Sequence, residues 1–131
     1  MIAQRIFLED YEWLINVFFG DDNSSTEELI DFMEIMHCSQ KEIASMRNIV
    51  DDSRRNVGFT YTDFDNMSTV VYISPCDSPN EYQNTFDHEK GHIGVHIATY
   101  YDIDPYGEEY QYLNGEIGER LFDVAKLFIC S

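Results

Sequence analysis

Three residues in the second half of the chain, His88, Glu89 and His92, have the types and spacing to bind a metal ion. In a helix, residues four positions apart lie on one face, with their Cβ atoms about 5–6 Å apart. Two imidazoles at that separation can share one tetrahedral cation through nitrogen–metal bonds of about 2.0–2.1 Å. Glu89 points about 100° round the helix from His88, so its carboxylate can reach a water on the metal rather than the metal itself. The pattern predicts a divalent metal site with a general base beside it.

The sequence around these residues predicts the helix that such a site requires. Asn84 or Thr85 can cap the start of the helix, and the Asp104-Pro105 step ends it after Tyr101. Gly91 costs the helix about 1 kcal/mol relative to Ala, so we expect another backbone to pass close to it. An apolar stripe at helical spacing lies on the other side of the segment, formed by Phe86, Ile93, Ile97, Tyr100 and Tyr101.

The run His88-Glu89-Lys90-Gly91-His92 resembles the H-E-x-x-H signature of the zincin metallopeptidases. With His96 one turn further on, a strand pair before it and an acidic helix after it, residues 57–122 are similar to small intracellular zincins of bacteria and phages. The resemblance implies a Zn²⁺ ion bound by His88 and His92, with Glu89 as the catalytic general base. It also implies that the chain hydrolyses a peptide bond in a peptide or protein substrate.

A catalytic zinc ion usually has three protein ligands and one open position, so we expect a carboxylate on the next predicted helix to complete the site. Glu108 is the first choice, because it stands at the start of that helix, directly after the turn that folds the helix back. It also precedes Tyr112-Leu113 by one turn, as an acidic residue does in similar phage sequences. Glu119 is the next candidate, since it lies 27 residues after His92, a spacing similar to that of another intracellular zincin group.

Three further candidates for the third ligand remain open. Glu109 stands beside the first choice at the start of the helix, and Glu116 lies one turn before Arg120, with which it could pair instead. His96 lies on the metal face, but three ligands on successive turns span about 11–12 Å, which is too long for one ion. This favours a place for His96 beside the metal, beside the substrate or simply at the surface. The oxyanion of the reaction also needs a donor, for which Tyr100, Tyr101, Tyr106 and His96 are equal candidates.

Hydrophobic spacing and capping signals predict the other elements of the fold. They are helices at residues 3–19, 25–37 and 39–53, a hairpin of strands at 57–62 and 67–73, and a last helix from about Tyr106 to Phe128. A loop of about ten residues is expected between the hairpin and the metal helix. Together these elements predict a single zincin-like domain over residues 1–131, of the α+β class. In this minimal fold three N-terminal helices pack on the hairpin, the H-E-x-x-H helix and a C-terminal helix, with the metal site between the last two.

The composition limits the partners that we expect. The formal net charge is −17 at pH 7 in 131 residues, which repels nucleic acid and anionic membranes, so we expect the chain to bind neither. Cys38, Cys76 and Cys130 form no close pair and no C-x-x-C motif, which favours a reducing compartment. Without a secretion signal or an apolar run of about 20 residues, the expected location is the cytoplasm.

A second interpretation is a non-catalytic module that keeps a zincin scaffold for binding other proteins, in a phage or mobile element. The acidity of the chain and its nine Tyr residues would suit a protein-binding surface. The two interpretations differ in whether the metal helix supports hydrolysis, and the oligomeric state follows from neither.

Overall fold

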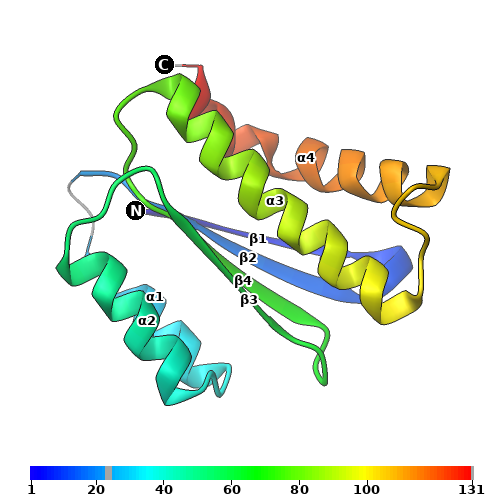
Figure 1. Ribbon diagram of the computed structural model, residues 1–131, viewed down its shortest axis with the longest axis horizontal. Coiled ribbons are helices and arrows are strands. Elements are labelled where there is room, and N and C mark those ends of the chain that lie inside the picture. The colour runs from blue at the N-terminus through cyan, green and yellow to red at the C-terminus, as the bar shows by residue number, and fades with distance from the viewer. Residues whose placement is uncertain (23–24, 131) are drawn as a thin grey trace.

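The computed structural model describes residues 1–22 and 25–130, and within them four strands form one mixed sheet in the order β1-β2-β4-β3 (Figure 1). The strands are β1 (Ile2–Leu8), β2 (Trp13–Phe19), β3 (Gly58–Asp63) and β4 (Ser68–Ile73). β1 runs antiparallel to β2, β2 parallel to β4, and β3 antiparallel to β4. β3 therefore lies at one edge of the sheet and β1 at the other.

The first predicted helix, residues 3–19, is wrong, because this segment forms β1, a short 3-10 helix η1 (Glu9–Tyr11) and β2. β2 lies in the middle of the sheet, and six of its seven residues are buried. A strand that is covered on both faces is apolar along most of its length, and such a run cannot be distinguished from a buried helix by spacing alone. The expected fold of three N-terminal helices is corrected accordingly: two strands come first, and the chain is α+β with a four-stranded sheet.

The next two predicted helices are present as α1 (Glu27–Ile35) and α2 (Gln40–Asp51). The side chain of Ser39 accepts a hydrogen bond from the backbone N–H of Glu42, which is the contact that a capping box provides. The predicted hairpin is present as β3 and β4. The capping and alternation patterns were sufficient to predict these helices and this hairpin, because each pattern depends on a few neighbouring residues.

The helix α3 (Pro79–Tyr101) begins earlier than predicted. Ser78 is its N-cap and accepts from the backbone N–H of Glu81, and Pro79 occupies the first turn, where a proline lacks only an N–H that would be unpaired in any case. Asn84 and Thr85 are therefore inside the helix and do not cap it. The loop between β4 and α3 is therefore shorter than the ten residues that we expected.

Helices cover both faces of the sheet (Figure 1). α3 and α4 (Glu108–Ile129) pack against one face, and α1 and α2 against the other. α3 lies over β3 and β4, while α4 lies beside it over β1. One side of α3 therefore faces the edge strand β3. Among the described helices, none is long and apolar enough to cross a membrane.

Candidate metal centre

The side of α3 that packs against α4 is the side that carries Lys90 and Gly94. The Nζ atom of Lys90 lies 3.2 Å from the place that a Cβ atom would take at Gly118 of α4. A Cβ atom at Gly94 would lie 3.3 Å from the hydroxyl oxygen of Tyr110 of α4. At about 100° per residue, the side chains at positions 88 and 92 point roughly 160° away from that side. The two histidines therefore lie on the side of α3 away from α4.

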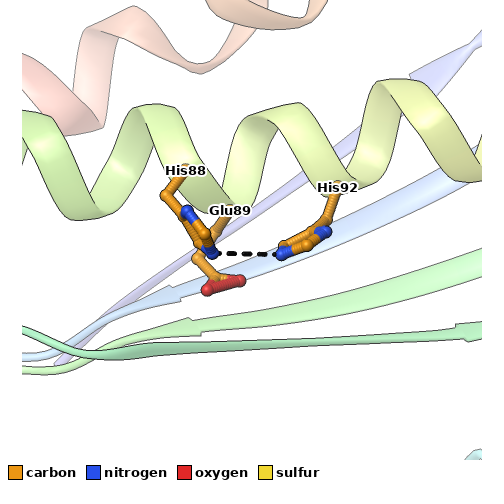
Figure 2. Close-up of side chains that lie close together, drawn as sticks. All are labelled: His88, Glu89 and His92. Carbon is orange, nitrogen blue, oxygen red and sulfur yellow. Dashed lines mark hydrogen bonds between the residues drawn. The ribbon is translucent and has the colours of Figure 1, made fainter.

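His88, Glu89 and His92 come together as a cluster in which the possible ligand atoms all lie within 4.8 Å of one another. Figure 2 shows the three side chains leaving α3 on the side of the strands. The two Nε2 atoms are 3.1 Å apart, with both rings exposed. Two nitrogens bound to one tetrahedral ion with bonds of about 2.0–2.1 Å would be about 3.3 Å apart. The spacing of the two imidazole nitrogens therefore fits a divalent metal ion such as zinc, with the carboxylate of Glu89 close enough to reach a water on that ion.

Glu89 is held between α3 and β3. Its side chain is 4% exposed, and its Oε2 accepts a hydrogen bond of 2.6 Å from the hydroxyl of Thr60. The strand passes so close that a Cβ atom at Gly58 would lie 2.4 Å from Cγ of Glu89. A buried carboxylate requires a hydrogen-bonding partner, and here β3 supplies it. The carboxylate is thus fixed beside the two imidazoles.

Beside the cluster lies a depression of about 300 Å³. It is bounded by the segment that leads into Gly58 at the start of β3 and by the part of α3 that ends with His88 and Glu89. Its lining residues are Asn56, Val57, Gly58, Asn84, Thr85, His88 and Glu89. The cluster is therefore accessible from an open concave surface.

His96 lies one turn beyond His92, with 6.2 Å between the ring centroids. Its Nδ1 is 2.7 Å from the hydroxyl oxygen of Thr62 on β3, and its ring is half-buried beside Phe64. Burial lowers the pKa of His96, and the neighbouring His92 lowers this pKa further.

The structure does not bring the proposed third ligand, Glu108, into the cluster. In the residues that it describes, the group of possible ligands ends with His88, Glu89 and His92, and no carboxylate of α4 belongs to it. Glu108 and Glu119 are exposed on α4. The cluster thus lies between α3 and β3 instead of between α3 and α4.

The other two acidic candidates have partners away from the cluster. Glu116 lies 3.7 Å from Arg120, one turn on, which is the pairing anticipated above. Glu109 lies near Tyr11: burial raises the pKa of this tyrosine most, and the charges of Glu109 and Glu116 are among those that raise it further. Both carboxylates therefore belong to the side of α4 near the turn between β1 and β2.

The contacts from β3 were not predicted. Gly58, Thr60 and Thr62 alternate along the strand and face α3, whereas Phe59 and Tyr61 pack against the other helical layer. The signal that could have found them is the alternation itself, since every second residue of this strand is small or a threonine. Which helix these residues would face is tertiary information that the alternation does not contain.

Comparison of the chain with known proteins gives no relative from which a role could be taken: no family model, no curated protein and no solved structure matches it. The class of site is therefore defined by its own geometry, which is a two-histidine, one-glutamate cluster that could hold a metal ion.

Proposed function

We propose that this protein is a zinc-dependent hydrolase of peptide bonds, in which His88 and His92 hold the ion and Glu89 is the general base. The observation that carries the proposal is the pair of imidazole nitrogens 3.1 Å apart beside a buried carboxylate. The resemblance of the H-E-x-x-H run to the zincin metallopeptidases supports zinc as the ion and the peptide bond as the target. Zinc in this place would supply a Lewis acid and lower the pKa of a water molecule to about 7.

Glu89 is the residue that moves protons in this proposal. Its carboxylate takes a proton from the attacking water and delivers it to the leaving amine. The hydrogen bond from Thr60 and the close approach of Gly58 orient the carboxylate before the substrate arrives. Because a base held in one place loses little freedom during the reaction, this orientation should contribute to the rate.

The position of the cluster beside an edge strand supports a peptide as the substrate. β3 pairs with β4 on one side, and no strand in residues 1–22 or 25–130 pairs with its other side. An extended peptide can add to such an edge by backbone hydrogen bonds. A peptide bound there would pass next to Glu89, because Thr60 of the same strand contacts this residue.

The test begins with zinc content. Protein purified without a chelator should contain about one zinc per chain by elemental analysis, as expected for one site. The wild type should then cleave members of a peptide mixture analysed by mass spectrometry. Glu89→Gln should retain zinc and lose cleavage, because the amide cannot accept the proton. Zinc far below one per chain in the wild type would refute the proposal before any assay of hydrolysis.

A protein-binding module without catalysis is the second candidate function. Large aromatic side chains at the start of α4 and just before it favour it: Tyr106 is 94% exposed and Tyr112 is 75% exposed. Such a module should bind its partner equally well as wild type and as Glu89→Gln, with no cleavage by either. Cleavage by the wild type alone would exclude this candidate.

A further inference from the structure

His96 is the outer end of a chain of hydrogen bonds that starts in the core. The indole Nε1 of Trp13 donates to the hydroxyl oxygen of Thr69 over 2.9 Å. That oxygen lies 2.8 Å from the hydroxyl oxygen of Thr62, which lies 2.7 Å from Nδ1 of His96. Trp13 and Thr69 are fully buried and Thr62 is 9% exposed, so water does not compete for the two inner contacts, whereas the contact with His96 is partly buried.

The direction of the chain follows from counting protons. An indole N–H can only donate, and each threonine hydroxyl has one proton to donate. If Thr69 donates to Thr62, and Thr62 donates to His96, every proton has an acceptor. If Nδ1 of His96 donated instead, only one of the two threonine hydroxyls could donate to the other, and the remaining hydroxyl proton would have no acceptor in the part of the chain that the structure describes. A buried donor without a partner is unfavourable, so the chain runs outward.

The outward direction determines the state of the imidazole. Because Nδ1 of His96 accepts a hydrogen bond, the ring is neutral and carries its proton on Nε2. A metal-bound histidine has the opposite arrangement, since its free nitrogen donates to an acceptor while the other nitrogen binds the ion. In this tautomer, His96 can donate a hydrogen bond through its Nε2–H.

We propose that His96 is not a metal ligand but a hydrogen-bond donor whose Nε2–H binds the substrate oxygen that becomes negatively charged during hydrolysis, and that Thr62 is the residue that positions it. This role rests on the proposed function. It selects His96 from the four donors that the sequence left open, since its ring stands beside His92 on the same helix. A donor that is oriented before the reaction stabilises such an oxyanion more than a mobile one.

The tautomer is tested on the metal-free protein, by nitrogen NMR with labelled histidine. Wild type should show His96 with a protonated Nε2 and an unprotonated Nδ1. Thr62→Val should give a mixture of the two tautomers, because the hydroxyl that selects one of them is absent. Thr69→Val is the matched control: it also loses one buried hydroxyl, but Thr62 can still donate to His96. A protonated Nδ1 in the wild type would overturn the inference, even if both variants failed to fold.

Zinc titration separates a donor from a ligand. His96→Gln should bind zinc with an affinity within a few-fold of the wild type, whereas His92→Ala should lose most of it. A loss of zinc affinity in His96→Gln comparable to that in His92→Ala would show that His96 binds the ion. This measurement requires no turnover of substrate.

The catalytic arm measures kcat and KM on a peptide that the wild type cleaves. His96→Ala should lower kcat by about 10²–10³-fold, as removal of an oxyanion donor does, with little change in KM or zinc content. If the wild type is active and the kcat of His96→Ala is unchanged, this inference fails and the proposed function stands. If the wild type binds no zinc and cleaves nothing, the donor role falls with the proposed function, while the NMR result still decides the tautomer.

Discussion

Gly58 of β3 lies so close to Glu89 of α3 that a Cβ atom added at position 58 would be 2.4 Å from Cγ of the glutamate. Glu89 is buried at this point, so its side chain cannot move into solvent without opening the contact between the strand and the helix. Gly58→Ala should therefore lower the free energy of unfolding by about 1–3 kcal/mol, as overpacking does. It should also displace the carboxylate and reduce hydrolysis while zinc remains bound, which urea unfolding, a peptide assay and elemental analysis would measure.

The control for this variant is a substitution at Gly91, which lies in the same helix as Glu89. Contrary to our expectation of a close backbone, a Cβ atom at Gly91 would meet nothing within 4 Å. Gly91→Ala should therefore stabilise the protein by about 0.5–1 kcal/mol through helix propensity, with activity unchanged. Equal stability and equal activity in the two variants would show that β3 does not constrain Glu89.

The hydroxyl of Thr60 is the donor that holds the carboxylate of Glu89, at 2.6 Å. Thr60→Val keeps the shape of the side chain and removes this donor, whereas Thr60→Ser keeps the donor and removes a methyl group. A hydrogen bond to a charged group contributes about 1.5–3 kcal/mol, so Thr60→Val should be less stable by about that amount and less active than Thr60→Ser. Chemical unfolding and peptide cleavage would compare them. Similar values for the two variants would mean that the hydroxyl does not orient the carboxylate.

Zinc should stabilise the folded protein through His88 and His92. A ligand that binds only the folded state adds about 2.7 kcal/mol to the free energy of unfolding when its concentration is 100 times its Kd. In His88→Ala this increase should disappear. His37→Asn is the control, because His37 lies between α1 and α2 on the other side of the sheet, with a φ of 58° that asparagine tolerates. If zinc stabilises His88→Ala as much as it does His37→Asn, the ion binds somewhere else.

The part of the site that the sequence predicted is the part that lies on one helix. The spacing of His88 and His92 determines that they share a face as soon as the segment is helical, and α3 is helical there. The choice of Glu108 as a third ligand depended on how the next helix packs against α3. That packing is decided by small residues such as Gly94 and Gly118, where the two helices meet, and the spacing of the acidic residues contains no information about it.

The error in the first segment has a similar origin. Apart from Asn16, residues 13–19 are apolar because β2 has a helical layer on each side, with Val17 and Phe19 in one core and Phe18 in the other. That covering is a property of the whole fold. The consequence reaches the site, because Trp13 at the start of this strand supplies the first donor of the hydrogen-bond chain that ends at His96. The predicted helix at residues 3–19 gave no reason to expect this contact between Trp13 and the rest of the sheet.

Cys38 gives a prediction for the opposite face of the sheet from the cluster. Its side chain is buried among the residues of α1 and α2, and burial, with smaller contributions from Glu42 and Asp63, raises the pKa of the thiol from 9.0 to about 11. Because the folded state keeps this proton longer than the unfolded chain does, the stabilisation is complete below about pH 9 and is lost as the pH rises towards about 11. One pKa unit corresponds to about 1.4 kcal/mol, so we expect a loss on the order of 2 kcal/mol, which Cys38→Ala should not show. Urea unfolding of both proteins between about pH 8 and about pH 11 tests this, since their tyrosines contribute equally and cancel in the difference. Parallel pH profiles would mean that the Cys38 thiol ionises as readily in the folded protein as in the unfolded chain.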